Sequence, residues 1–185
     1  SNEYAIMEEV ILVNEQDEEI GVMEKIQAHK EGKLHRAFSV FLFNGRNEML
    51  LQKRAASKYH SPNLWTNACC SHPRPDENVD RAAERRLTEE MGISNVPLHK
   101  KFSFIYNAPF DNGLTEHELD YVFVGRTNDL PVLNIDEVSD YKYVSLASIT
   151  EDINIFIRGD LEAVASKGQF EMEIAEGRVS NNKIK

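Results

Sequence analysis

The sequence predicts an α+β fold, an α/β/α sandwich in which helices flank a mixed central sheet. Two observations predict it: strand-like segments precede and follow one strongly periodic helix, and the end of the chain has a helical pattern. The length of 185 residues suits one domain with a sizeable core. We therefore expect a single domain over residues 1–185, with a core of about 10–147 and a helical C-terminal segment over 148–185.

The first half of the chain is predicted to contain three strands. VILVN (10–14) and AFSVFLF (37–43) are apolar, as strands of a buried sheet are. MLLQKRA (49–55) follows the second of them after the turn NGRNE (44–48), which predicts a hairpin. The polar stretch EKIQAHKEG (24–32) predicts a helix or a loop.

A helix is predicted from Asp76 to Met91. Apolar residues recur there at steps of three and four, at Val79, Ala82, Ala83, Leu87 and Met91. Gly92 stands where a C-cap is expected.

Three more strands are predicted after the helix. They cover 100–108, 118–127 and 140–146, and a loop with Asn112-Gly113 joins the first two.

Composition excludes some classes of function. A formal net charge of −10 disfavours a general nucleic-acid or membrane-surface binder, because both need basic patches. Such an average still leaves room for a local cluster of Arg and Lys. No apolar run is long enough to span a bilayer and no signal peptide is recognised, so we expect a cytoplasmic protein.

Cys69 and Cys70 are the only cysteines and are adjacent in TNACCSHP (66–73). A disulfide between neighbours would be strained, and the CxxC spacing of zinc ribbons is absent. Two interpretations remain for each cysteine: a reactive thiol or a simple core residue.

Residues 71–93 resemble the Nudix signature G-x5-E-x7-R-E-U-x-E-E-x-G-U, where U is a bulky aliphatic residue. The matching residues are Glu77, Arg85, Leu87, Glu89, Glu90, Gly92 and Ile93. Ser71 replaces the leading glycine and Arg86 replaces the glutamate of the R-E pair. Nudix hydrolases use helix glutamates to hold divalent metals, so a cation there indicates the Nudix fold but not ordinary hydrolysis. The alternative is a solvated acidic helix with weak i,i+4 ion pairs.

A second group of residues has the chemistry of a metal site. Its members are His29, His35, His72, Glu116 and Glu118. If 116–118 is extended, the two glutamates face one side and His117 the other. Imidazole ligands favour Mn, Fe or Zn over Mg. The alternative is that each histidine is an ordinary surface or capping residue.

A third group is basic. Lys25, Arg54, Lys58 and Arg86 stand out against the acidic total and could bind diphosphate oxygens. The alternative is solvated surface charge.

These groups together resemble the type I isopentenyl-diphosphate isomerases, a family of the Nudix superfamily. The similar segments are LVN, EKIQAH, LHRAFSVFLF, KRAASK, WTNACCSHP, RAAERRLTEEMG, TEHE and DEVSDYKYV, which span about residues 10–147. WTNACCSHP together with TEHE is highly specific, and family members also carry a basic residue at the place of Arg86. The resemblance implies a Nudix-fold isomerase that interconverts isopentenyl and dimethylallyl diphosphate in isoprenoid synthesis.

The resemblance also implies roles for single residues. Cys70 and Glu118 would be catalytic, with Tyr106 supporting Glu118. His29, His35, His72, Glu116 and Glu118 would bind a transition metal, Mn²⁺ or Zn²⁺. Glu90 would bind a second metal, Mg²⁺, that enters with the diphosphate, and Lys25, Arg54, Lys58 and Arg86 would hold that diphosphate. Cys69 would be a small packing residue.

One segment departs from the family. Isomerases have a tryptophan in a Pro-Trp segment near the C-terminus, whereas this chain has EDINIFIRGDLEAV there and its only tryptophan is Trp65. Phe156 is a candidate replacement for a ring that faces a substrate cation.

The expected partner is therefore a small prenyl diphosphate, with neither nucleic acid nor a membrane, and the expected state is a monomer. Two alternatives stay open. A Nudix hydrolase of a nucleoside or other diphosphate would give Cys70 no necessary role. In a metal- or diphosphate-binding regulatory domain, the full set of acid, base and ligands would be surplus.

Overall fold

The computed structural model of the chain describes residues 8–58, 62–110 and 112–145. These ranges contain nine strands and two helices, α2 (Lys25–Glu31) and α3 (Val79–Met91). The strands are β1 (Glu9–Val13), β2 (Glu19–Glu24), β3 (His35–Phe43), β4 (Met49–Arg54), β5 (Trp65–Thr66), β6 (Cys69–Ser71), β7 (His99–Pro109), β8 (Thr115–Arg126) and β9 (Val138–Val144).

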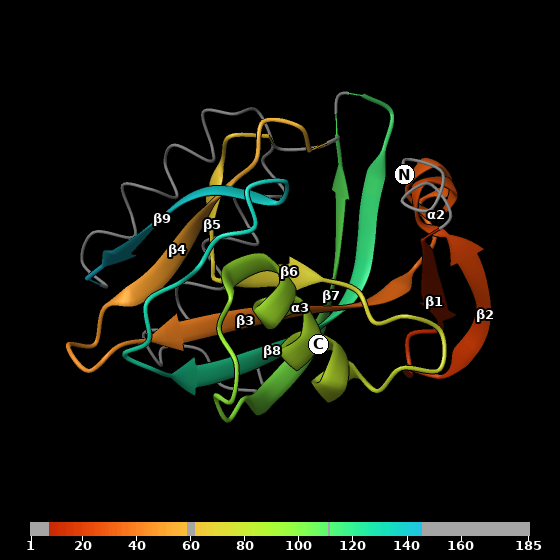
Figure 1. Ribbon diagram of the computed structural model, residues 1–185. Helices are drawn as coiled ribbons and strands as arrows, with labels where there is room; N and C mark the ends of the chain where they lie inside the picture. Colours follow the sequence, from red (N-terminus) through yellow and green to blue (C-terminus); the bar gives the residue numbers. More distant parts are fainter. Residues whose placement is uncertain (1–7, 59–61, 111, 146–185) are drawn as a thin grey trace.

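β3 is the centre of a mixed sheet (Figure 1). It runs parallel to β8 along its whole length and antiparallel to β1, β4 and β6. The other pairs, β1–β2, β4–β5, β4–β9 and β7–β8, are antiparallel. A parallel pair in an otherwise antiparallel sheet confirms the predicted mixed sheet.

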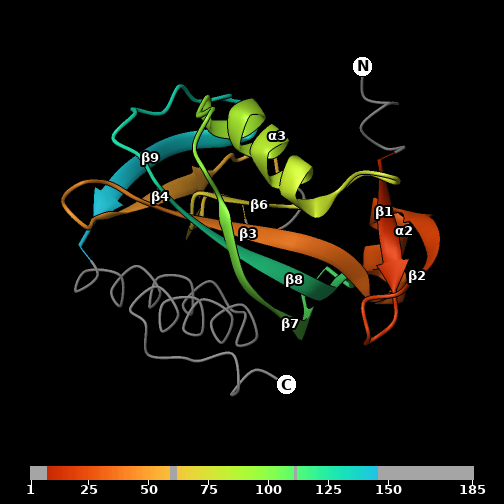
Figure 2. The same ribbon diagram turned by 90° about the horizontal axis from the view of Figure 1, so that it is seen from below.

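The alternation of side chains along β3 divides the core between the two faces of the sheet. Phe38, Val40 and Leu42 pack in the cluster that includes the apolar side of α3, which covers this face of the sheet (Figure 2). Phe41 and Phe43 belong to a separate cluster on the opposite face. Burying each of these large side chains contributes about 1.5–3 kcal/mol, so both faces hold the strand in one register.

Helix α3 begins at Val79, three residues later than the sequence pattern predicts. The side chain of Asn78 accepts a hydrogen bond of 2.8 Å from the backbone N–H of Asp80, which makes Asn78 the N-cap. Asp76 has a left-handed φ of 63°, which a helix does not tolerate. The predicted C-cap is confirmed: Gly92 has φ 64°, and a Cβ on it would lie 2.7 Å from the carbonyl oxygen of Val132.

The segment predicted as a helix or a loop is the short helix α2. The Glu24 side chain caps its start by accepting from the N–H groups of Ile26 and Gln27, and Gly32 ends it in the left-handed conformation. Because α2 leads directly into β3, it brings His29 close to His35.

The predicted strands are all present, with ends that move by a few residues. The structure adds β2, β5 and β6, which the sequence pattern did not indicate. β2 has two glutamates and no buried residue, and β5 and β6 have two and three residues, too few to show a period. The predicted helical segment 148–185, and Phe156 within it, lie outside the described residues. In the described ranges, no helix is both long and apolar enough to cross a bilayer.

Candidate active site

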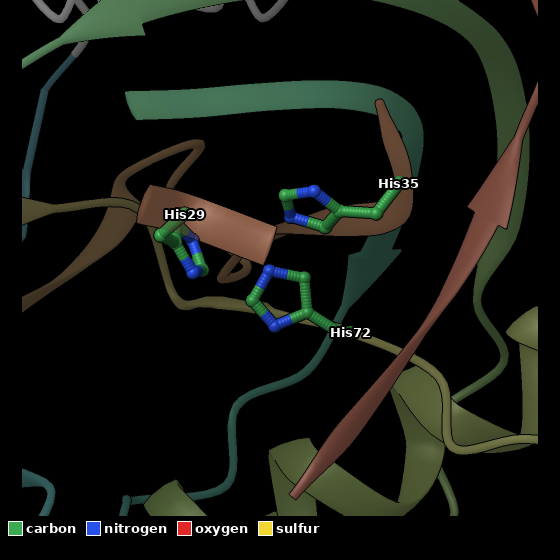
Figure 3. Close-up of side chains that lie close together, drawn as sticks. All are labelled: His29, His35 and His72. Carbon is green, nitrogen blue, oxygen red and sulfur yellow. The ribbon is translucent and has the colours of Figure 1, made fainter. Parts of the chain in front are cut away.

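Three histidines from separate segments converge at one end of β3. His29 lies on α2, His35 begins β3, and His72 directly follows β6. Ring nitrogens of the three lie within 4.8 Å of one another, and the rings face a common space (Figure 3). The sequence places His72 far from the other two, so their convergence is a product of the fold.

The rings of His29 and His35 are oriented by backbone carbonyls. Nδ1 of His29 lies 2.7 Å from the Lys25 carbonyl oxygen, and Nδ1 of His35 lies 2.9 Å from that of Lys33. A carbonyl only accepts, so each Nδ1 donates its hydrogen and Nε2 carries the lone pair. Nε2 of His35 is buried and makes no hydrogen bond among the described residues. This arrangement is typical of metal-binding histidines, whose second nitrogen is held by a backbone or carboxylate acceptor.

Burial favours the neutral form of His29 and His72. It lowers the pKa of His72 to about 4, against a smaller opposing effect of the hydrogen bond to Glu118. Burial also lowers the pKa of His29, with the neighbouring His35 acting in the same direction. Neutral imidazole is the form that binds a metal, so the residues fit a divalent ion at the cluster.

The strand register brings Glu118 to the histidines. Glu118 pairs with His35 in the parallel β3–β8 ladder. Its Oε2 lies 3.1 Å from Nε2 of His72 and 3.7 Å from Nε2 of His35. Glu116, also buried, lies two residues earlier on the same face of β8. His117 faces the other way, with Nδ1 3.0 Å from the Gly32 carbonyl oxygen, which confirms the predicted alternation.

Glu118 is paired with His35 of β3 on one side of β8 and with Tyr106 of β7 on the other. Tyr106 is directly opposite Glu118 in the antiparallel β7–β8 ladder. Side chains of directly paired residues lie on the same face of a sheet. His35, Glu118 and Tyr106 therefore form one row across three strands.

The two adjacent cysteines lie on opposite faces of the sheet. Cys69 pairs with Val40 and is fully buried in the cluster beneath α3. Cys70 pairs with Ser39 on the other face and is only partly buried. Ser39 and His35 are both odd-numbered residues of β3, so Cys70 shares its face with the His35–Glu118–Tyr106 row.

Cys69 and Glu90 are connected across the opposite face. The Cys69 thiol donates a hydrogen bond of 2.8 Å to Oε2 of Glu90. Burial raises the pKa of both groups, and the Glu90 carboxylate raises that of Cys69 further. Nη2 of Arg86 lies 3.6 Å from Oε1 of Glu90 and forms an i,i+4 ion pair with it. Cys69 thus packs in the core, as the sequence suggests, and also donates a hydrogen bond to Glu90.

The basic residues gather around a carboxylate that sequence reasoning missed. Glu137 accepts a hydrogen bond of 2.5 Å from Lys58, and the same oxygen lies 3.5 Å from Nη2 of Arg86. Arg54 is paired with Val138, the residue after Glu137. Although burial opposes it, Lys58 and Arg86 lower the pKa of Glu137, so it is ionised at neutral pH. Glu137 directly precedes β9, in the segment DEVSDYKYV that is similar to the isomerases, and that segment was the available signal in the sequence.

Lys25 starts α2 and pairs with Glu8 at 2.8 Å. Lys25, His72 and Arg86 all lower the pKa of Glu8, against the opposing effect of burial. The Glu8 carboxylate is therefore influenced both by the basic residues and by the histidine cluster.

The predicted site residues fall into two groups. One side holds the histidines, Glu116, Glu118, Tyr106 and Cys70. The other side, around α3, holds Lys58, Arg86 and Glu90.

Comparison with solved structures places this fold among the Nudix proteins. The chain superposes on a protein from Deinococcus radiodurans with a TM-score of 0.67 and 20% identity, covering 88% of this chain and 98% of that one. A MutT protein from Methanosarcina mazei gives a TM-score of 0.53 at 21% identity, over 64% of this chain and 81% of the other. The NUDIX domain profile matches residues 33–161. The chain is a member of the Nudix family.

Two curated relatives define the family more narrowly. An isopentenyl-diphosphate Delta-isomerase of Aromatoleum aromaticum is 56% identical over 147 residues, which are 80% of this chain and 82% of the relative. One from Pectobacterium atrosepticum is 53% identical over 143 residues, 77% of this chain and 79% of the relative. The chain belongs to the isopentenyl-diphosphate Delta-isomerase family.

Proposed function

We propose that the protein interconverts isopentenyl diphosphate and dimethylallyl diphosphate, with Cys70 and Glu118 as its catalytic residues. The observation that carries the residue assignment is their common face of the sheet, next to the histidine cluster. The identity of more than half with curated isomerases supports the reaction.

The reaction explains why two such groups are needed. An isolated alkene has no carbonyl to delocalise charge, so the double bond must gain a proton to form a tertiary carbocation. A neighbouring carbon then loses a proton. An acid and a base must therefore approach the five-carbon unit at different points.

The strand positions separate the two proposed catalytic residues along β3. Cys70 is paired with Ser39 and Glu118 with His35, four residues apart on β3, which corresponds to about 13 Å along the strand. Ala37 occupies the position between them on this face and has a small side chain. The Cys70 thiol and the longer Glu118 side chain would approach a hydrocarbon placed above Ala37 from its two ends.

Glu118 and Tyr106 have complementary tasks in this proposal. The Glu118 carboxyl exchanges the proton with the substrate, and Tyr106, its neighbour in the β7–β8 ladder, orients it. Cys70 exchanges the other proton.

His29, His35, His72 and Glu116 would hold a transition metal, Mn²⁺ or Zn²⁺, together with Glu118. When bound, such a metal supplies positive charge that makes an attached carboxyl group more acidic.

The second group of residues would bind the diphosphate. Lys25, Arg54, Lys58 and Arg86 provide cationic donors for its oxygens. Glu90 would hold a Mg²⁺ that enters with the substrate, since Mg²⁺ is typically shared between a carboxylate and phosphates.

A monomeric state, a cytoplasmic location and the lack of nucleic-acid or membrane partners stay predictions from the sequence.

Deuterium incorporation tests the proposal. The metal-loaded protein is incubated with isopentenyl diphosphate, Mg²⁺ and Mn²⁺ in heavy water, and the products are followed by NMR. We expect deuterated isopentenyl and dimethylallyl diphosphates from the wild type and from the control His117→Ala, and none from Cys70→Ala. Release of phosphate without exchange would instead identify a Nudix hydrolase.

A further inference from the structure

Asn67, between β5 and β6, is a buried polar residue to which neither the motifs nor the proposed mechanism gives a role. Its side chain is 3% exposed. Nδ2 donates to two main-chain carbonyl oxygens, that of Val40 at 2.8 Å and that of Cys69 at 3.0 Å. Carbonyl oxygens cannot donate, so the amide must point its NH₂ group at them. The orientation of the Asn67 amide is therefore determined by the main chain of β3 and β6.

The oxygen of this amide consequently faces Cys70. Oδ1 of Asn67 lies 3.0 Å from the Cys70 sulfur and 3.0 Å from Oγ1 of Thr66. An amide oxygen only accepts, so the sulfur contributes the hydrogen. The thiol of Cys70 thus points its S–H bond at a group that cannot rotate without losing two buried hydrogen bonds.

Ser39 is a second neighbour of the Cys70 sulfur. Ser39 donates its hydroxyl hydrogen to Oδ2 of Asp120 at 2.9 Å. Its oxygen lies 3.6 Å from the Cys70 sulfur, farther than the Asn67 oxygen at 3.0 Å, which accepts the single thiol hydrogen. Ser39 and Asp120 are both fully buried, so solvent does not compete for the hydrogen bond between them.

We propose that Asn67 is a positioning residue that fixes the direction of the Cys70 side chain on the substrate face of β6. The inference rests on the proposed function, because Cys70 is the catalytic thiol there. Asn67 does not touch the substrate; it connects the thiol to the Val40 carbonyl of β3, the strand that also carries His35. The distance between the thiol and the Glu118 end of the site is then fixed by one strand.

Removal of Asn67 is expected to affect turnover more than binding. Asn67→Ala removes the 3.0 Å hydrogen bond of the Cys70 thiol. A resulting displacement of about 1 Å at a reacting group costs about 10²-fold in rate. We expect kcat to fall by that order while KM stays within about twofold, because the diphosphate residues lie elsewhere. The control is Thr66→Val, which removes the other hydrogen bond to Oδ1 and leaves the amide fixed; its kcat should stay within about twofold of the wild type.

The infrared S–H stretching band provides a readout that does not depend on activity. The chain has two cysteines, so the difference between the wild type and Cys70→Ala isolates the band of Cys70. We expect this band at the lowered frequency of a hydrogen-bonded thiol, unchanged in Thr66→Val and raised in Asn67→Ala.

Three results would overturn the inference. One is a wild-type Cys70 band at the frequency of a thiol without a hydrogen bond. This measurement does not depend on whether Asn67→Ala folds. The others are an unshifted band or an unchanged kcat in a folded Asn67→Ala protein. If the wild type showed no deuterium exchange at all, the proposed function would fail, while the infrared result would still decide whether Asn67 holds the thiol.

Discussion

The thiol of Cys69 donates a 2.8 Å hydrogen bond to the carboxylate of Glu90, and both groups are buried between β6 and α3. Glu90 is the residue proposed to hold Mg²⁺. The cysteine on the α3 face is therefore hydrogen-bonded to the carboxylate proposed for the second metal, whereas its neighbour Cys70 belongs to the opposite face. Adjacent identical residues contact different parts of the site because strand residues alternate between faces.

The first prediction concerns this hydrogen bond. Cys69→Ala removes the donor and leaves a buried carboxylate oxygen without it, which costs about 1–3 kcal/mol. We expect a lower free energy of unfolding in urea and a severalfold higher Mg²⁺ concentration for half-maximal isomerisation, but not loss of the reaction. Cys69→Ser keeps a donor and should retain the wild-type Mg²⁺ requirement. Equal Mg²⁺ requirements for the Ala and Ser variants would show that the hydrogen bond does not position Glu90.

The second prediction concerns the histidine cluster. His72→Ala removes one of three converging imidazoles, and loss of a ligand should lower the bound transition metal well below the wild-type stoichiometry. The matched control is His117→Ala, since His117 lies between Glu116 and Glu118 but faces the opposite side. Elemental analysis after dialysis measures the metal bound by each of the two variants. The site would have to be reassigned if the two variants retained the same amount of metal.

The third prediction concerns the basic residues around Glu137. Lys58→Met removes the cation bonded to Glu137 and leaves that carboxylate beside Arg86. Loss of a charge-assisted contact worth about 1.5–3 kcal/mol should raise KM about tenfold or more, with a smaller change in kcat. Lys30→Met removes the same charge from an exposed position on α2 and serves as the control. Steady-state kinetics, with inorganic pyrophosphate as a competitor, distinguishes them; similar KM values would place the diphosphate elsewhere.

The fourth prediction concerns pH and the Glu77–Arg85 pair. Glu77 accepts hydrogen bonds of 2.7 and 2.9 Å from Arg85, which lower its pKa from 4.5. A carboxyl whose pKa is lower in the folded state stabilises the fold above its unfolded pKa, and this contribution disappears as the pH falls through the folded pKa. Glu77→Gln should therefore destabilise by about 1 kcal/mol at pH 7 and by much less near pH 3. Urea unfolding at the two pH values measures this, and a pH-independent difference would contradict it.

Much of the fold could be predicted because its main elements have clear local signals. β3 is a long apolar run, and α3 has a 3.6-residue period followed by Gly92. The missed strands lack such signals: β5 and β6 are formed by pairing with β4 and β3, not by their own composition. The start of α3 depends on the Asn78 cap and the left-handed Asp76, which apolar periodicity does not reveal.

The residue types of the candidate site were predicted from the sequence, and only the family resemblance implied that its histidines converge, as the structure shows them to do. The predicted alternation at 116–118 is a local property, and the structure confirms it. The convergence of His72 with His29 and His35 depends on long-range strand pairing. Glu137 and Asn67 lie in the segments DEVSDYKYV and WTNACCSHP, but residue type alone assigned neither a role, which became clear only from their contacts.

The opposite orientations of Cys69 and Cys70 give the chain a built-in pair of labelling sites. The partly exposed Cys70 should react with a thiol reagent in the native state. Cys69 becomes accessible only when α3 separates from β6, so its slower labelling rate measures how often that layer opens. One reagent applied over time would thus report first on the substrate face and then on the local unfolding of the helix that carries Glu90.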